Sequence, residues 1–189
     1  LDNFSRETAR RRAEDEVERL AFYDPLTNLP NRRLLHDHLK KSFANSGRTS
    51  HHGAVLFIDI DNFKSFNDRF GHAVGDKILS AIGGIISRSL RQVDYAFRYG
   101  GEEFVILLPE TPLENAILTV ERIRMRIADE ASSSVPEAHG SRITVSAGVA
   151  CYPENGSKRE DLFSLMDSYL YKAKSMGKNR VCHSFTQDL

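Results

Sequence analysis

The residues of this chain best suited to chemistry include two aspartates at the end of a short apolar run. Asp59 and Asp61 follow the segment from Ala54 to Ile58. Side chains alternate along a strand, so residues two positions apart point to the same side. Neighbouring carboxylates repel each other unless a cation lies between them, and such hard oxygen ligands favour Mg²⁺. Aspartate also commonly ends a strand and caps the next element, so this pair alone leaves a structural role open.

A second acidic pair follows a Gly-Gly turn. Glu102 and Glu103 come directly after Gly100 and Gly101. Because glycine takes positive φ freely, the two glycines predict a hairpin, and its bare tip lets a polyanionic ligand approach the backbone. Adjacent glutamates are electrostatically costly there without a compensating cation. The alternative is an exposed hairpin with solvated glutamates.

Apolar periodicity predicts the elements that must position these carboxylates. The continuous apolar run at 54–58 is typical of a central strand that is buried on both faces. A helix with a broad apolar face follows it, and then two short strands flank the Gly-Gly turn. The expected elements are, in order, a helix at 34–43, a strand at 54–58, a helix at 74–90, strands at 95–99 and 104–108, a helix at 113–127, a strand at 143–150, a helix at 162–173 and a strand at 181–185.

The β-α-β-β-α-β order at the centre predicts an α+β domain of split-βαβ type. Its central sheet is mostly antiparallel and is flanked by helices. In such a sheet the first strand lies beside the hairpin, so Asp59, Glu102 and Glu103 are expected to converge on one or two Mg²⁺ ions. Phosphoryl and nucleotidyl transfer need this arrangement, because the metal neutralises phosphate charge while a carboxylate takes a proton from the attacking hydroxyl.

Length and composition exclude several other classes of protein. The 189 residues suit one domain with a short extension, and 26 basic against 26 acidic residues give no net charge that would draw the chain to nucleic acid or an anionic membrane. Cys151 and Cys182 do not form a CxxC pair, so we expect neither a disulfide framework nor a zinc site. No apolar run approaches the roughly 20 residues needed to span a bilayer, and no signal peptide is visible.

The start of the chain is charge-dense and has helical spacing. Ala13, Val17 and Leu20 are separated by four and three residues, as in a helix or a heptad. This segment is either a solvated helix or the end of a coiled coil that arrives from an upstream domain. The chain begins at Leu1; we interpret it as a fragment of a longer protein, although a processed N-terminus would look the same.

Five motifs, taken in order, resemble the GGDEF domains, here in the GGEEF form. The resemblance covers roughly 22–186, which leaves 1–21 as an N-terminal linker helix and 187–189 as a tail. The motifs are Asp24-Pro25-Leu26-Thr27-Asn28-Leu29-Pro30-Asn31-Arg32-Arg33, Phe57-Ile58-Asp59-Ile60-Asp61-Asn62-Phe63-Lys64 with Asn67-Asp68, Gly71-His72-Ala73-Val74-Gly75-Asp76, Arg98-Tyr99-Gly100-Gly101-Glu102-Glu103-Phe104, and Tyr171-Lys172-Ala173-Lys174-Ser175-Met176-Gly177-Lys178-Asn179-Arg180.

This resemblance implies a diguanylate cyclase, whose fold is similar to class III nucleotidyl cyclase catalytic domains and polymerase palms. Two GTP molecules condense to cyclic di-GMP and two pyrophosphates, with Mg²⁺, or alternatively Mn²⁺, as cofactor. Each site holds one GTP, so catalysis needs a homodimer, and the N-terminal helix would set the encounter by raising the effective concentration. An upstream sensory or receiver domain is expected. The expected location is the cytoplasm, with membrane anchorage through a preceding part as the alternative.

The resemblance also assigns roles to the acidic residues. It implies Asp59, the backbone carbonyl of Ile60, Glu102 and Glu103 as metal ligands. Glu102 is the candidate base for the 3′-hydroxyl. The division of roles between Glu102 and Glu103 stays open, so both are kept as catalytic candidates.

The resemblance further assigns nucleotide-binding residues. Asn67 and Asp76 would read guanine, because a carboxylate accepts from N1–H and the 2-amino group, and adenine lacks that donor pair. Lys174 and Lys178 are placed four apart on one helical face and assigned to phosphates; the alternative is a cationic helix end favoured by the dipole. Other residues assigned to GTP are Phe63, Lys64, His72, Gly100 and Gly101, and packing of the turn is an equal alternative for His72.

A product-binding inhibitory site is implied at Arg91-Gln92-Val93-Asp94, which matches an RxxD motif upstream of the hairpin. Arginine binds phosphate and stacks on guanine, and aspartate accepts from the guanine edge. A surface ion pair is the alternative on spacing alone. Arg122 matches the family's secondary arginine, which would bind product from a neighbouring domain.

Two rival functions remain beside the active cyclase. One is a catalytically silent module that binds GTP or cyclic di-GMP, which a broken hairpin motif would favour; here residues 100–104 are intact. The other is an enzyme with an altered substrate, such as ATP, or a mixed dinucleotide product. Asn67 and Asp76 argue against the second rival.

Overall fold

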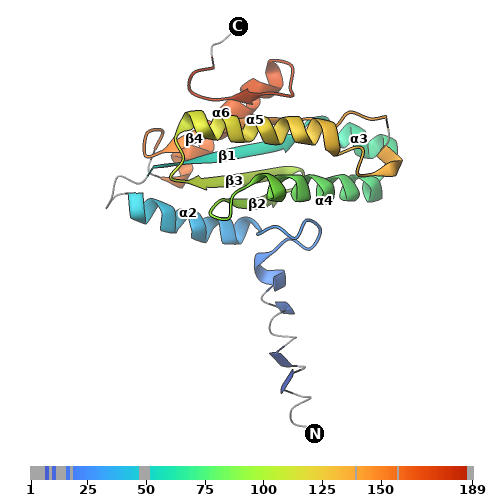
Figure 1. Cartoon of the computed structure of the whole chain (residues 1–189), viewed down its shortest axis with the longest axis horizontal. Helices are drawn as coiled ribbons and strands as arrows, with labels where there is room; N and C mark the ends of the chain where they lie inside the picture. Colours follow the sequence, from blue (N-terminus) through green and yellow to red (C-terminus); the bar gives the residue numbers. More distant parts are fainter. Residues whose placement is uncertain are drawn as a thin grey trace.

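The protein is described here by a computed structural model that covers residues 7–8, 10–11, 16–17, 19–46, 52–138, 140–156 and 158–186. Figure 1 shows the arrangement of its elements. They are α2 (Arg32–Ser46), β1 (Gly53–Ile60), α3 (Phe63–Phe70), α4 (His72–Ser89), β2 (Tyr95–Gly100), β3 (Glu103–Pro109), α5 (Leu113–Glu130), a short 3₁₀ helix (Pro136–Ala138), β4 (Val145–Tyr152), α6 (Arg159–Ser175) and β5 (Val181–Cys182).

The sheet confirms the predicted α+β class and split-βαβ order. Its five strands lie in the order β2-β3-β1-β4-β5, with β1 in the centre. Pairing is antiparallel except for the short parallel pair of β4 with β5. Every residue of β1 is buried, as its continuous apolar run predicts.

The alternation of side chains along β1 divides the core into two clusters. Leu56 and Ile58 belong to the cluster formed with α4 and α5, whereas Val55 and Phe57 belong to the cluster formed with α2 and α6. In Figure 1, α4 and α5 cross the front of the sheet. By the same alternation, Asp59 belongs to the α2/α6 face.

The structure differs from the sequence-based expectation at three elements. Helix α3 was not predicted, and it lies before Gly71, where φ of 85° separates it from α4. The last strand is limited to Val181–Cys182 instead of 181–185. The sequence Thr111-Pro112-Leu113-Glu114 predicts a capping box at the start of α5, but no side-chain hydrogen bond caps this helix among the described residues, and the Thr111 hydroxyl donates to the Pro109 carbonyl at 2.9 Å. A second capping box is predicted at Ser157-Lys158-Arg159-Glu160, but Ser157 lies outside the described residues.

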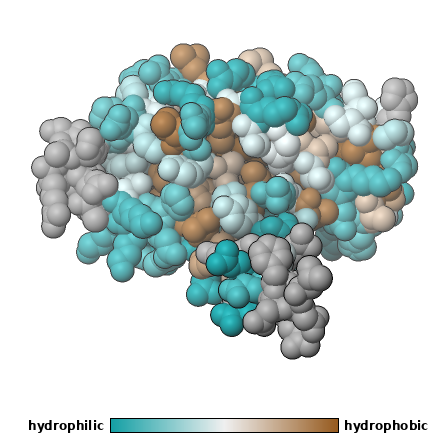
Figure 2. Space-filling view, turned by 60° about the horizontal axis from the view of Figure 1, so that its bottom comes forward, coloured by the Kyte–Doolittle hydropathy of each residue, from teal (hydrophilic) through white to brown (hydrophobic). Residues whose placement is uncertain are grey.

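Polar side chains cover most of the face that contains α2 (Figure 2). Each helix within the described residues is too short or too polar to cross a bilayer. In the predicted linker, the described residues 7–8, 10–11, 16–17 and 19–21 are helical. The boundaries of 1–21, 22–186 and 187–189 stay predictions, and 187–189 lie outside the described residues.

Candidate active site

The antiparallel register places two of the predicted carboxylates opposite each other. Asp59 at the end of β1 pairs with Glu103 at the start of β3, and the Ile60 N–H donates to the Glu102 carbonyl at 3.3 Å. Cross-strand partners project to the same face, so Asp59 and Glu103 both belong to the α2/α6 face. The predicted convergence of the first strand with the hairpin is confirmed.

The hairpin tip is shaped by its glycines. Gly101 has a φ of 26°, and the register shifts between Arg98 and Gly100, which opens the ladder before Glu103. A Cβ atom at Gly100 would lie 3.5 Å from the Glu103 Oε2 atom. The bare backbone of Gly100 therefore forms one wall beside the Glu103 carboxylate.

The electrostatics of this cluster favour a cation. Burial raises the pKa of Asp59, and the charges of Glu102 and Asp61 add to that rise, while the hydrogen bond from Lys174 opposes it. Burial, followed by the charges of Asp59 and Glu102, also raises the pKa of Glu103. Raised carboxylate pKa values mean that the charged forms are disfavoured, and a divalent cation would reverse that balance.

The positive charge beside Asp59 in the structure is the ammonium group of Lys174. Its Nζ atom lies 2.8 Å from Asp59 Oδ1, and the Asp59 side chain is only 10% exposed. Lys174 stands in the last turn of α6. The site thus already contains a charge-assisted contact between the helix and the central strand.

Lys178 does not share a helical face with Lys174, so that prediction is wrong. Helix α6 ends at Ser175, and Gly177 and Lys178 both have positive φ, of 109° and 64°. The Lys178 N–H donates to the Ala173 carbonyl at 3.0 Å and closes the helix end. The Lys178 side chain contacts the Asn62 amide, in the turn after β1. Both lysines nevertheless reach the end of β1.

The carboxylates form a donor set that fits a hard divalent cation. Asp59 and Glu103 are cross-strand neighbours, and Glu102 acts electrostatically on both. Among the described residues, no group of three or more His, Cys, Asp or Glu side chains is already arranged to hold a metal ion. A cation at Asp59 would take the place of the Lys174 ammonium.

Asp61 has the structural role that the sequence left open beside cation binding for this pair of aspartates. It accepts hydrogen bonds from the hydroxyls of Thr144 and Ser146, both at 2.7 Å, and from the Asn179 N–H at 3.0 Å. Its oxygens are therefore satisfied within the protein. Asp61 ties the end of β1 to the residues that follow α6.

The predicted guanine-reading residues lie on α3 and the first turns of α4. Asn67 is half-buried, and its Oδ1 atom is buried without a hydrogen-bond partner in the described structure. Gly75 makes room for it, because a Cβ atom there would lie 1.9 Å from that oxygen. Asp76 and His72 are exposed. An unpaired buried acceptor beside exposed polar groups is suited to a ligand that donates hydrogen bonds.

Two further predicted nucleotide contacts lie at the start of α3. Phe63 is 6% exposed, and its ring lies near Gly75, 3.2 Å from the position of a Cβ atom there. Lys64 is exposed in the same turn. Sequence reasoning assigned both residues but missed the helix; the aromatic spacing of Phe63, Phe66 and Phe70, whose rings are in contact, was the available signal.

The predicted inhibitory residues surround the end of α4. Asp94 Oδ2 accepts from the Arg91 N–H at 2.9 Å, while Asp94 Oδ1 is buried without a partner in the described structure. The Arg91 side chain is 59% exposed. Arg122 donates to the Ser89 carbonyl at 2.8 Å, so α5 delivers it to the same end of α4. The three residues lie apart from the carboxylate cluster.

Two contacts at the site escaped sequence reasoning. Arg98 donates to both Asp24 carboxylate oxygens, at 2.9 and 3.0 Å, and to the Gly101 carbonyl. Asp167 on α6 raises the pKa of Glu103, after the larger effects of burial, Asp59 and Glu102. Asp167 stands seven residues before Lys174, so helical spacing was an available signal for its place on the same face. The Asp24–Arg98 pair joins segments that are distant in the sequence, so no local pattern indicates it.

The matching family and two similar curated relatives are all described as diguanylate cyclases. The family described as "Diguanylate cyclase, GGDEF domain" matches residues 21–180. The chain is 38% identical over 174 residues to diguanylate cyclase DgcM of Escherichia coli, which covers 92% of this chain and 41% of that protein. It is 42% identical over 161 residues to diguanylate cyclase DgcP of Pseudomonas aeruginosa, with coverages of 85% and 24%. The chain therefore spans less than half the length of these relatives.

Solved structures agree with the fold. The coiled coil and GGDEF domain of DgcB from Caulobacter crescentus, in complex with c-di-GMP, has a TM-score of 0.84 at 30% identity and covers 97% of this chain and 96% of its own. The active GGEEF domain of a diguanylate cyclase from Vibrio cholerae has a TM-score of 0.75 at 34% identity, with coverages of 85% and 99%.

Proposed function

The chain belongs to the GGDEF family of diguanylate cyclases, and from that premise we propose that it condenses two GTP molecules into cyclic di-GMP and two pyrophosphates. The observation that carries the proposal is the register of Asp59 with Glu103 beside an intact Gly-Gly hairpin, with Lys174 at the same point. Cytoplasmic GTP is the proposed substrate, and cyclic di-GMP the proposed product and inhibitor.

Asp59, the Ile60 carbonyl, Glu102 and Glu103 are the proposed Mg²⁺ ligands. Bound Mg²⁺ would neutralise the charge on the transferring phosphates. Lys174, which pairs with Asp59 at 2.8 Å, is within reach to bind phosphate once that pairing is released. Lys178 adds a second positive charge from the turn after α6.

The chemical step needs a base and a second nucleotide. Glu102 is the proposed base that takes the 3′-hydroxyl proton. The 3′-oxygen of one GTP attacks the α-phosphorus of the other, the new phosphodiester forms, and the bond to pyrophosphate breaks. The same exchange in the opposite direction closes the ring. Each chain provides one site, so two copies must face each other, and holding them together supplies the required orientation.

Guanine selection is proposed to lie with Asn67 and Asp76. Among the described residues, the buried oxygen of the Asn67 amide has no hydrogen-bond partner, and Asp76 is an exposed carboxylate one helical turn after His72. Guanine offers N1–H and the 2-amino group to such acceptors, whereas adenine does not offer this pair of donors. ATP would therefore leave acceptors unsatisfied, which penalises its binding.

The test is incubation with GTP at high protein concentration, with nucleotides separated by chromatography. Glu102→Gln should abolish cyclic di-GMP formation, and Glu114→Gln, an exposed glutamate at the start of α5, is the matched control. Removal of Mg²⁺ by EDTA should stop turnover, and Mn²⁺ should restore it. Absence of product from an artificially dimerised parent, with retained GTP binding, would instead identify a silent binding module.

Inhibition by product is tested separately at the RxxD motif. Arg91→Ala should weaken cyclic di-GMP binding and relieve inhibition, because Arg91 is the exposed cation beside Asp94, whose Oδ1 atom has no partner among the described residues. Unchanged inhibition in this variant would assign the Arg91–Asp94 contact to turn structure alone.

A further inference from the structure

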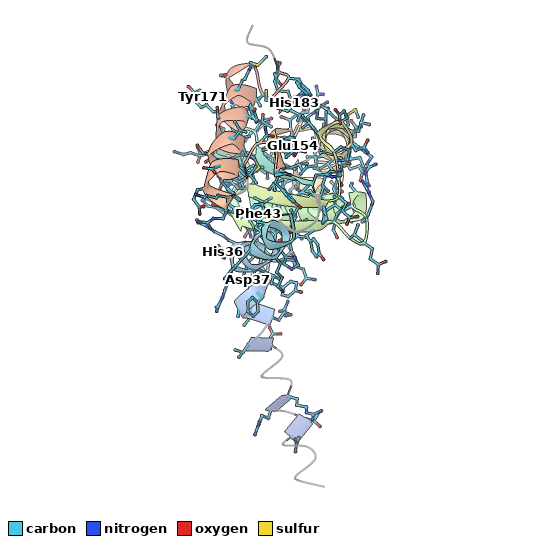
Figure 3. The ribbon with its side chains drawn as sticks, turned by 90° about the vertical axis from the view of Figure 1, so that its left-hand side faces the viewer. His36, Asp37, Phe43, Glu154, Tyr171 and His183 are labelled. Carbon is cyan, nitrogen blue, oxygen red and sulfur yellow. The ribbon has the colours of Figure 1, made fainter. Side chains whose placement is uncertain are left out.

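A basic cleft lies beside the hairpin tip, between the starts of α2 and α6. Its volume is about 840 Å³, and the backbone of Gly100 and Gly101 forms part of its wall. In Figure 3, His36 and Asp37 of α2 lie near the end of α6 that is opposite Tyr171. Four arginines, Arg32, Arg33, Arg98 and Arg159, line the cleft against two aspartates, Asp24 and Asp37. The lining therefore carries an excess of positive charge.

Two of the arginines carry their charge without a carboxylate partner in the part of the chain that the structure describes. The Arg32 guanidinium lies 4.6 Å from the centre of the Tyr99 ring, and Arg33 lies 5.2 Å from that of Phe22. By contrast, Arg98 pairs with Asp24, and Arg159 pairs with Glu160. An aromatic face holds a guanidinium in place without neutralising it. Arg32 and Arg33 are therefore positioned cations whose charge is available to an anion.

The cleft adjoins the candidate active site at the glycine turn of the hairpin. Gly100 lines the cleft, and the position of a Cβ atom on it would be 3.5 Å from the Glu103 carboxylate. Tyr99, which supports Arg32, belongs to the same core cluster on the α2/α6 face as Phe57. Neither Lys174 nor Lys178 is among the residues that line the cleft. The positive charge here is thus additional to that of the lysines after β1.

We propose that this cleft is a second phosphate site, separate from the catalytic one, which binds a di- or triphosphate chain. Guanidinium groups present a planar fork of donors that matches phosphate oxygens, and the glycine tip lets such a chain approach the backbone. The compound that supplies this phosphate chain is inferred from the proposed function. It is either the released pyrophosphate or the triphosphate of the nucleotide that the partner copy presents.

The experiment measures binding of inorganic pyrophosphate by calorimetry, in EDTA and at fixed ionic strength. Without a divalent cation, the acidic site repels pyrophosphate, so binding reports the cleft. The double variant Arg32→Gln/Arg33→Gln should weaken binding at least tenfold. Lys40→Gln/Lys41→Gln, with the same charge change at exposed positions of the same helix, should change it less than twofold. The affinity of Arg32→Lys/Arg33→Lys for pyrophosphate should lie between those of the parent and the glutamine variant. Lysine keeps the charge but lacks the planar set of donors of a guanidinium group.

A GTP analogue that cannot react distinguishes the two sources. Competition between the analogue and pyrophosphate in the Lys174→Gln variant assigns the cleft to the triphosphate chain, whereas binding of pyrophosphate alone assigns it to the leaving group. Equal weakening in the arginine and lysine variants, or no weakening in the arginine variant while circular dichroism shows it folded, overturns the proposal. Neither result affects the cyclase assay, which is run separately with Mg²⁺.

Discussion

At the scale of single residues, the position of the Asn67 amide depends on the small size of Gly75. A Cβ atom on Gly75 would lie 1.9 Å from Asn67 Oδ1, far inside contact distance. Gly75 is buried within α4, where alanine would otherwise be favoured over glycine by roughly 0.5–1 kcal/mol. The glycine therefore preserves the position of the Asn67 amide rather than the stability of the helix.

Gly75→Ala is predicted to raise KM for GTP at least tenfold. The added methyl group must displace the Asn67 amide, which removes an acceptor from the proposed guanine site. Steady-state kinetics and direct GTP binding are the measurements. Gly84→Ala on the same helix is the control, because its Cβ atom would meet only the flexible end of Arg88, at 3.0 Å. Equal effects of the two substitutions would contradict this role for Gly75.

Residue roles were predicted from sequence with uneven success. Asp59 and Glu103 were predictable, because an apolar run and a Gly-Gly turn fix where two strands end. Asp61 was not, since its three donors come from residues far along the chain and no local pattern reveals them. Lys178 was misplaced because a spacing of four residues suggests a helical face shared with Lys174, whereas α6 ends at Ser175 and Gly177 has positive φ.

At the scale of elements, the contact of α6 with β4 depends on Gly148. A Cβ atom there would lie 2.4 Å from the Met166 carbonyl oxygen and 3.0 Å from the Leu170 nitrogen. These are backbone atoms of the helix, so they cannot move aside alone. The helix that carries Lys174 is therefore seated directly on the sheet at this position.

Gly148→Ala is predicted to destabilise the protein by about 1–3 kcal/mol, the usual cost of overpacking a core. It should also lower activity, because α6 would be lifted together with Lys174. Urea unfolding gives the free energy, and cyclic di-GMP formation gives the activity. A variant with an unchanged urea midpoint would show that the helix can shift without cost.

A second link between elements is the ion pair of Asp24 with Arg98. It joins the turn before α2 to the strand that leads into the hairpin. Burial alone would raise the pKa of Asp24, but the hydrogen bonds from Thr27 and the pairing with Arg98 outweigh it, so the pKa is lowered. The stabilisation is therefore present above the pKa of the unfolded chain, about 4, and is lost as pH falls through the folded value.

Asp24→Asn is predicted to destabilise the protein at pH 7 and pH 5, with a difference from the parent that shrinks below about pH 4. Urea midpoints at several pH values measure this difference. Asp129→Asn, an exposed position on α5, is the control and should follow the parent throughout. A gap for Asp24→Asn that persists at the lowest pH would assign the loss to packing rather than to charge.

Element prediction succeeded where one pattern dominates. Strand β1 and the hairpin were found because apolar continuity and glycine pairs are strong signals. Helix α3 was missed because its eight residues mix exposed polar groups with phenylalanines, and only Phe63 is buried. The fold around the sheet was thus predictable, and the short elements that carry nucleotide contacts were less so.

At the scale of the whole molecule, the proposed reaction requires two chains. Each chain contributes one set of Asp59, Glu102 and Glu103, and the chemistry joins two nucleotides. Specific activity is therefore predicted to fall on dilution and to recover when an artificial dimer is fused to the N-terminus. Product formation over a hundredfold range of protein concentration measures this dependence. Constant specific activity in the unfused chain would exclude an encounter of separate copies.

Strand β2 is an edge strand of the sheet, and the segment before α2 covers part of its open edge. The Arg98 N–H donates to the Pro30 carbonyl at 2.9 Å, and Asn31 forms a parallel bridge with Arg98. On the opposite side, β5 has only two residues. Open strand edges invite pairing between molecules and aggregation, and short or covered edges prevent it. The covered and short edges of this sheet therefore disfavour permanent strand pairing between copies, which suits the proposed reaction, because two copies must meet and then separate.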